Sequence, residues 1–222
     1  MNSAIHPATT PTTTPAPAAS SGSGSATRSR LLDAAAKVFL VQGFTAASMD
    51  LVRQEAGVSN GSLYHHFPTK AQLADALYAH ILRDFHAALL PPIRGRAVQA
   101  EKGVKGLIRA YIQWVLQNPQ SARLLHELRR SAEISNGPNE GSGPDKAERD
   151  AVNADAFGAL TAWMAQRVEA GEMRAMPFHV WMALVFSPAL SLTQRWVSQP
   201  TPAVAPKVRA ALEHAAWMAV AP

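Results

Sequence analysis

Residues 57–70 read GVSNGSLYHHFPTK, a stretch with two glycines, two histidines and only one formal charge. Ser59 is a favoured helix N-cap, and Pro68 pushes the residue before it out of the helical conformation. The sequence therefore predicts a short helix from Ser59 to His66. A glycine inside such a helix costs about 1 kcal/mol relative to alanine, so Gly61 requires a reason. The flanking segments supply one.

The segments on either side have the patterns of further helices. One apolar helix face is formed by Leu31, Leu32, Ala35, Val38 and Phe39. This first helix is expected to end near Gly43, because glycine is favoured directly after a helix. Ser48 is predicted to cap a second, shorter helix, and Gly57 to provide the tight turn that follows it. Thr69 and Gln72 form a capping box that opens a fourth helix.

Two short helices joined by a glycine-containing turn are typical of a helix-turn-helix, in which the second helix enters the major groove of DNA. Leu63 and Phe67 are predicted to point inward and anchor that helix. The side chains on its outer surface are then small or polar. Small side chains let the backbone approach a duplex, and polar ones offer hydrogen-bond donors to phosphates and base edges. The predicted DNA-binding residues are Arg28, Ser48, Ser59, Asn60, Gly61, Ser62, Tyr64, His65 and Lys70, with Lys70 on a phosphate. The alternative is that Tyr64 and His65 only cap a small helical core.

These elements, in this order, resemble the amino-terminal domain of the TetR family, the tetracycline-repressor-like transcriptional regulators. The resemblance covers residues 27–83 and rests on LLDAA at 31–35, GF at 43–44, AGVSNGSLYHHF at 56–67 and TK at 69–70. Two positions depart from the family pattern, which often has Thr in place of Ala47 and usually a small Ala in place of Arg53. The first departure removes a phosphate contact, whereas the second either adds one or tilts the second helix.

The resemblance implies an all-α protein, with a three-helix helix-turn-helix DNA-binding head at 27–83 and a helical effector-binding and dimerisation body at 84–222. It implies a cytoplasmic homodimer that binds double-stranded DNA as a repressor and is released by a small-molecule effector. Each chain has one helix that enters the major groove, the predicted helix from Ser59 to His66, which we call the reading helix. Two-fold symmetry therefore predicts an inverted-repeat operator. Two alternatives remain: a regulator that binds DNA without an effector, and an all-helical enzyme.

The rest of the chain is predicted to fold into further helices. Apolar residues recur at helical spacing over 104–116 and 124–132. A Gly- and Pro-rich loop at 136–144 precedes a long helix that runs to about Ala170. Residues 178–199 are apolar nearly all round, so a helix there needs cover on several sides.

The last two helices are predicted to form the dimer interface. The helix at 203–221 has an alanine-rich face that allows close helix approach. The predicted interface residues are Trp181, Leu184, Val185, Pro188, Leu192, Leu212 and Ala215. The alternative is that both helices belong to the core of a single chain.

Two features of the body bear on the effector. Four large apolar side chains, Trp114, Phe157, Trp163 and Met164, are predicted to line its pocket, although their helical spacing is also typical of an ordinary core. The run His126-Glu127 with Arg129-Arg130 allows two interpretations: a solvated helix face, or a polar anchor for an anionic effector.

Composition narrows the functional classes. The chain has no cysteine, which excludes disulfides, thiolate metal sites and cysteine nucleophiles. It also has no His-Glu-x-x-His motif, so we expect no enzymatic activity, no cofactor and no metal site. A formal net charge of +5 permits a polyanionic partner. Residues 1–26 contain no Lys, Arg, Asp or Glu and are predicted to be a flexible tail, and no apolar run is long enough to span a membrane.

Overall fold

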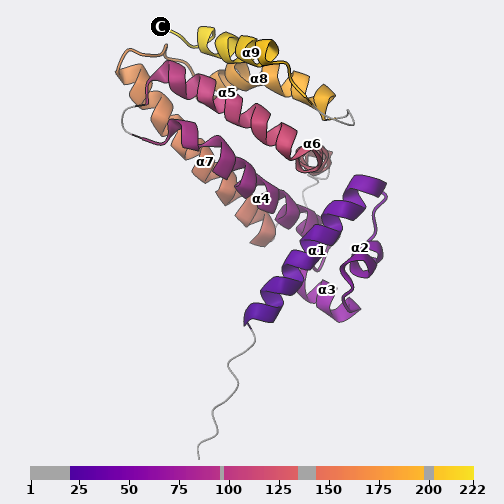
Figure 1. The fold of residues 1–222 in the computed structure, drawn as a ribbon. Coiled ribbons are helices and arrows are strands. Elements are labelled where there is room, and N and C mark those ends of the chain that lie inside the picture. The colour runs from indigo at the N-terminus through magenta and orange to yellow at the C-terminus, as the bar shows by residue number, and fades with distance from the viewer. Residues whose placement is uncertain (1–20, 96–97, 135–143, 198–202) are drawn as a thin grey trace, which may run out of the picture.

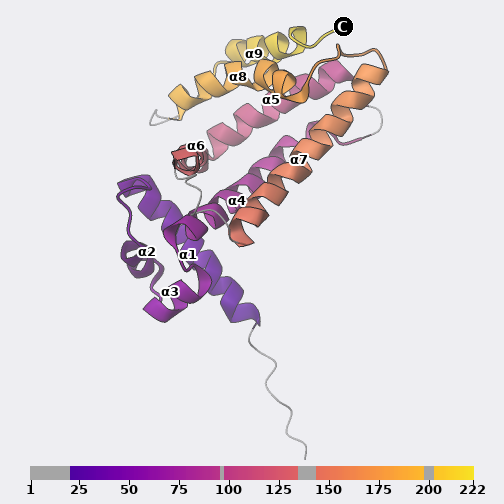
Figure 2. The ribbon, with the colours of Figure 1, turned by 180° about the vertical axis from the view of Figure 1, so that it is seen from behind.

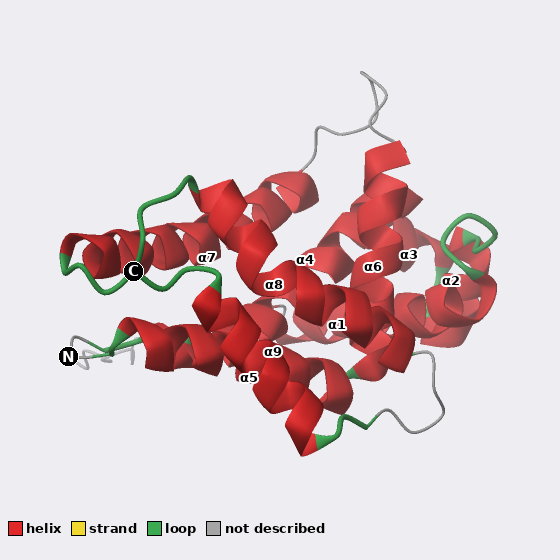
Figure 3. Ribbon diagram, turned by 90° about the horizontal axis from the view of Figure 1, so that it is seen from above, coloured by secondary structure: helices red, strands yellow, loops and turns green. Residues whose placement is uncertain are grey.

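The fold is entirely helical over the residues that the computed structural model describes, which are 21–95, 98–134, 144–197 and 203–222 (Figure 3). In chain order the helices are α1 (Ser21–Gln42), α2 (Met49–Ala56), α3 (Asn60–His66), α4 (Lys70–Leu89), α5 (Ala100–Gln117), α6 (Pro119–Ile134), α7 (Pro144–Glu169), α8 (Phe178–Trp196) and α9 (Pro206–Met218), with a 3₁₀ turn, η1 (Pro91–Ile93), after α4. The all-α class predicted from the sequence is confirmed. None of the described helices is both long and apolar enough to cross a membrane.

Helices α1, α2 and α3, with the start of α4, form a head at one end of the molecule (Figure 1). The three helix starts predicted there are capped as expected: the hydroxyls of Ser48, Ser59 and Thr69 each accept a backbone N–H three residues later, at 3.2, 3.2 and 3.1 Å. Gly43 and Gly57 end α1 and α2 with φ of 76° and 63°, a conformation that other residues adopt only with strain. The helix boundaries of the head therefore follow from local signals.

The head has its own apolar core beneath α3. Leu63 and Phe67 are fully buried there, as predicted, and Phe39 and Val52 belong to the same core. Burial of one such side chain stabilises a fold by about 1.5–3 kcal/mol. Two buried anchors fix the orientation of a helix of only 7 residues, so the opposite face of α3 is held toward solvent.

The predicted boundary of the amino-terminal tail is wrong in one respect. Helix α1 begins at Ser21, so residues 21–26 are helical rather than part of a tail that ends at 26. Once a helix is nucleated by packing, each added residue gains a backbone hydrogen bond at little cost, and a Ser- and Gly-containing segment can extend it. Residues 1–20 lie outside the described residues, as does most of the loop predicted at 136–144.

The body contains α4 to α9. Helices α4 and α7 lie side by side, α5 lies next to α4, and α8 and α9 are outermost (Figures 1 and 2). Helix α4 runs without a break through residue 83, where the sequence placed the domain boundary, so head and body share one helix. Helix α7 runs away from the head: near its start Glu148 lies 3.6 Å from Arg28 of α1, and beyond its end Glu172 accepts the N–H of Ala100 at 2.8 Å.

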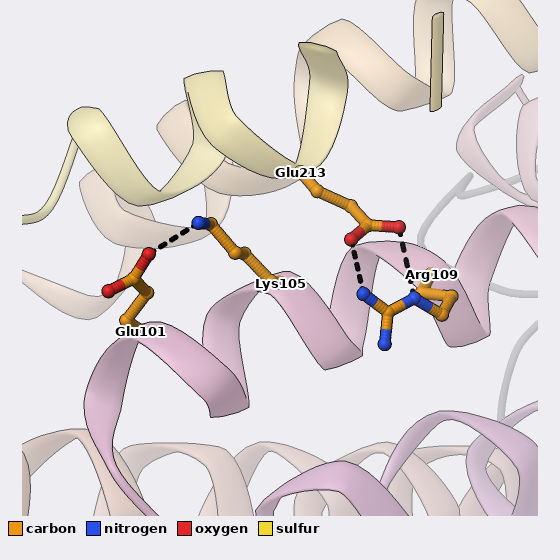
Figure 4. A network of polar contacts seen from close by, with 4 residues as sticks. All are labelled: Glu101, Lys105, Arg109 and Glu213. Carbon is orange, nitrogen blue, oxygen red and sulfur yellow. Dashed lines mark hydrogen bonds and ion pairs between the residues drawn. The ribbon is translucent and has the colours of Figure 1, made fainter. Parts of the chain in front are cut away.

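An ion pair between a buried carboxylate and an exposed guanidinium joins α9 to α5 (Figure 4). The two carboxylate oxygens of Glu213 accept hydrogen bonds from Arg109 at 3.1 and 2.5 Å. Glu213 is buried, and its hydrogen bond raises the pKa of Arg109 above the ordinary value. One turn before Arg109, Lys105 pairs with Glu101 along α5 itself. The Glu213 contact sets the rotation of α9 and thereby decides which of its faces is covered by α5.

Candidate nucleic-acid interface

The outer face of α3 carries mainly small or polar side chains and is open to solvent. Asn60, Gly61, Tyr64 and His65 are exposed, and Ser62 is half-buried. A methyl group added at Gly61 would meet no atom within 4 Å, and Gly61 does not have a positive φ. Nothing inside the protein therefore requires this glycine, although it weakens the helix. A helix that presents its bare backbone outward can approach another molecule closely.

The two capping serines keep a donor for an external partner. Ser48 and Ser59 accept backbone N–H groups at the starts of α2 and α3. A hydroxyl has one O–H donor in addition to its acceptor lone pairs, so capping leaves that O–H available. Both side chains are exposed. They are suited to phosphate oxygens, which accept hydrogen bonds but do not donate them.

Lys70 requires a correction. Its ammonium group donates to the backbone carbonyls of Phe44, Thr45 and Ala47 at 3.0, 3.1 and 2.9 Å, and it lies 4.8 Å from the centroid of the Phe44 ring. An ammonium has three N–H donors, and all three are engaged within the protein. The geometry therefore does not support the predicted phosphate contact. Lys70 instead ties the loop between α1 and α2 to the start of α4.

Arg28 is half-buried and contacts other parts of the protein. Its guanidinium lies 5.3 Å from the centroid of the Phe67 ring, at the end of α3, and 3.6 Å from Glu148 of α7. It thus connects the reading helix with the body, which the sequence did not predict. Arg53, one of the two departures from the family pattern, pairs with Asp50 of the same helix at 2.8 Å. Ala47, the other departure, is buried.

A cavity of about 190 Å³ lies in the body between α4, α5, α6, α7 and α8. Its walls are mostly apolar. Of the four predicted pocket residues, Trp114 and Phe157 line this cavity. The prediction is wrong for Trp163 and Met164, which are buried in the core outside it. Trp163 packs against Gly103 of α5 so closely that a methyl group added there would come within 2.3 Å of its ring.

A few polar groups interrupt these apolar walls. His126 and Arg129 line the cavity from α6, so the charged run that the sequence left open is not simply a solvated face. His86 of α4 is buried, burial lowers its pKa, and its Nδ1 has no hydrogen-bond partner among the described residues. Tyr111 shares a hydrogen bond of 2.8 Å with Thr193 of α8. No group of three or more His, Asp or Glu side chains in the described part of the chain could hold a metal ion.

Sequence reasoning missed the residue that connects this cavity to the head. Glu127 follows His126 on α6 and accepts the backbone N–H of Phe44 at 2.5 Å. The two residues are 83 positions apart, and no local pattern marks the contact. The cavity wall on α6 and the loop before the helix-turn-helix are therefore directly joined.

The predicted dimer-interface residues divide into two groups. Trp181, Val185 and Leu212 are buried inside the single chain, so their assignment to a surface is wrong. Trp181 donates its ring N–H to the sulfur of Met173 and is covered by aromatic neighbours. The second group faces outward: Leu184, Pro188 and Ala215 are exposed, and Leu192 is half-buried. One face of α8 and α9 thus belongs to the core, and the other is an exposed apolar face.

Comparisons with known proteins agree with this description. The model for bacterial regulatory proteins of the tetR family matches residues 31–77. The HTH-type transcriptional regulator UidR from Escherichia coli K12 is 42% identical over 72 residues, which are 31% of this chain and 35% of UidR. The chain thus spans about a third of the length of this relative.

The likeness in fold extends further along the chain. A TetR family transcription regulator from Marinobacter aquaeolei VT8 has a TM-score of 0.69 at 22% identity, over 90% of this chain and 98% of that one. FadR from Bacillus subtilis, in complex with stearoyl-CoA, has a TM-score of 0.62 at 14% identity, over 86% of this chain and 96% of FadR. The sequence match covers the head, including α3, and the likeness in fold continues through the body.

Proposed function

We propose that the protein is a transcriptional regulator that binds an inverted-repeat operator in double-stranded DNA as a homodimer. The observation that carries this proposal is the outer face of α3. Leu63 and Phe67 anchor the helix from within, while Gly61 leaves open space on the outside. In a helix that faces only water, such a glycine would lower helix stability without any benefit. In a helix that enters the major groove, it allows the backbone to approach the DNA closely.

The DNA contacts follow from this placement. Asn60, Tyr64 and His65 are exposed on α3 and reach base edges or phosphates. The O–H groups of Ser48 and Ser59 bind phosphate oxygens at the starts of α2 and α3. Lys70 acts indirectly, because it holds the loop that positions α2.

The exposed apolar face of α8 and α9 supports the homodimer. Leu184 of α8 is 43% exposed, and Met218 and Val208 of α9 are 55% and 39% exposed. Large apolar side chains exposed on neighbouring helices are typical of an interaction site. A two-fold axis through it makes an isologous contact and presents two reading helices to two half-sites. One reading helix alone makes too few contacts for a specific affinity in the nanomolar range.

The cavity supports release by a small effector. Its apolar walls and few polar groups are typical of ligand sites, although it is smaller than most. A ligand that moves α6 also moves Glu127, which holds the backbone of Phe44 before the helix-turn-helix. We therefore propose that occupation of the cavity weakens DNA binding and that the protein acts as a repressor. A regulator without an effector remains the second candidate, and it predicts that no ligand changes the affinity for DNA.

A matched pair of glycine substitutions tests the proposal. Gly61 and Gly158 both lie within helices, and a Cβ atom added at either meets nothing within 4 Å. Gly61→Leu and Gly158→Leu should both retain or slightly increase thermal stability, because leucine favours a helix by about 0.8–1 kcal/mol over glycine. Only Gly61→Leu should lose affinity, by at least about tenfold, for a duplex selected from a random library. Equal binding by both variants, or a wild-type protein that enriches no duplex, contradicts the proposal.

A further inference from the structure

The cavity is lined by basic side chains but by no acidic ones among the described residues, which the proposed function does not by itself require. Its lining includes one arginine, Arg129, and two histidines, His86 and His126, but no aspartate or glutamate among the described residues. Burial keeps His86 neutral over a wider pH range by lowering its pKa. Of the nearby carboxylates, Glu127 binds the head, and Asp75 pairs with Arg149 at 2.6 Å. The cavity therefore disfavours a cation and favours an anion.

Apart from His86 and Tyr111, the polar groups of the lining lie toward one end of the cavity. His126 and Arg129 are one helical turn apart, so they share a face of α6, the helix that contacts the head. Helices α4 and α7 both run away from the head, and the first residues by which they line the cavity are polar, Tyr78 and Asn153. The last are apolar, Leu89 and Leu160. A ligand with one polar end and an apolar body thus has a single preferred orientation, with its polar end toward the head.

The size of the cavity limits that apolar body. An apolar cavity of about 150 Å³ in a protein core can bind benzene. A volume of about 190 Å³ therefore admits one ring with a short substituent, and it lies below the usual range of about 300–1,000 Å³ for drug-sized ligands. A long acyl chain such as that of stearoyl-CoA does not fit without enlargement of the cavity.

The walls are suited to a flat ring. Phe85 lies edge-to-face with Trp114 at 4.9 Å and with Tyr111 at 6.0 Å between ring centroids, and Tyr111 continues the series to Phe186 at 6.1 Å. All four residues line the cavity. A further aromatic ring gains the same edge-to-face contacts, which an aliphatic chain of equal volume does not.

We infer that the effector is a compact monocarboxylate with one aromatic ring, whose carboxylate is bound by Arg129 and His126 and whose ring lies among Phe85, Trp114 and Phe157. This inference rests on the proposed role of the cavity as the effector site. It does not require Arg129 to be without other partners, because a guanidinium has five N–H donors and can bind a carboxylate with two of them. It resolves the two interpretations of the charged run on α6 in favour of the anionic anchor.

The test uses four probes of similar size with the full-length protein: phenylacetate, its neutral analogue ethylbenzene, the cation phenethylamine, and octanoate. Binding is measured by calorimetry and by tryptophan fluorescence. Phenylacetate should bind most tightly, ethylbenzene at least about tenfold more weakly, because it lacks the charged hydrogen bonds, and phenethylamine not at all. Equal binding of phenylacetate and ethylbenzene would refute the claim that the cavity binds a carboxylate. Tighter binding of octanoate than of phenylacetate would refute the preference for an aromatic ring.

Two arginine variants locate the anchor. Arg129→Gln should lower the affinity for phenylacetate at least about tenfold and leave the affinity for ethylbenzene unchanged. Arg123→Gln is the matched control, since Arg123 is exposed on the same helix and does not line the cavity. Equal effects of the two substitutions overturn the assignment. DNA binding by the ligand-free protein is measured separately, so a cavity that binds none of the probes in a protein that binds its operator refutes this inference and not the proposed DNA binding.

Discussion

Glu127 and Lys70 bind the two polar backbone groups of the same residue, Phe44, from two different helices. Glu127 of α6 accepts the Phe44 N–H at 2.5 Å, and Lys70 of α4 donates to the Phe44 carbonyl at 3.0 Å. The loop between α1 and α2 is thus held by one anion and one cation. Charge-assisted hydrogen bonds are about twice as strong as neutral ones, so this loop is well placed to transmit a displacement of α6 to the head.

Removal of Glu127 should loosen that loop. Glu127→Ala leaves the Phe44 N–H, which is partly buried, without its acceptor, and we expect a loss of about 1–2 kcal/mol in the free energy of unfolding. Hydrogen exchange of the Phe44 amide should become markedly faster. Glu169→Ala is the control, because Glu169 is exposed at the far end of α7. Unchanged exchange at Phe44 in the Glu127 variant would show that the contact is not formed in solution.

Substitution of Lys70 separates a structural role from a phosphate contact. Lys70→Ala removes the donor shared by three carbonyls, so both stability and DNA affinity should fall. The slope of the logarithm of the binding constant against the logarithm of salt concentration should stay unchanged. A direct phosphate contact would instead reduce that slope by about one unit. Lys102→Ala, on the exposed surface of α5, should alter neither property.

A charge on the exposed face of α8 should prevent dimerisation. Leu184 is 43% exposed in the single chain, so Leu184→Glu is compatible with a folded protomer. In a dry two-fold interface the new carboxylate and its symmetry mate are unpaired, and association should weaken by several kcal/mol. Sedimentation should then show a monomer. Val41→Glu, which places the same charge on an exposed residue of α1, should remain a dimer; a dimeric Leu184 variant would place the interface elsewhere.

His86 predicts a dependence of stability on pH. Burial lowers its pKa below the ordinary value of 6.5 in the folded state, so the unfolded chain takes up the proton first as the pH falls. The free energy of unfolding should therefore decrease as the pH falls through about 6.5. His86→Gln should reduce this decrease, as measured by urea midpoints between about pH 7.5 and 5.5. The exposed control His179→Gln should keep it, and identical pH profiles of wild type and the His86 variant would refute the assignment.

The sequence by itself determined the head. Ser48, Ser59 and Thr69 cap helices by contacts that reach three residues along the chain, and Gly43 and Gly57 end helices through their own backbone conformation. Such signals act within one turn, so a single sequence contains all the information they need. The inward positions of Leu63 and Phe67 follow equally from helical spacing.

Only the tertiary structure decided which groups meet across the chain. Periodicity marks a side chain as apolar but does not say which neighbour covers it, so Trp181 and Val185 were expected at a surface and lie in the core. The same holds for polar groups: the sequence shows that Lys70 and Glu127 are charged, but their acceptor and donor in the α1–α2 loop lie 23 to 83 residues away. Those partners exist only once α4 and α6 are packed against the head, because packing and not local preference brings the backbone of Phe44 between them.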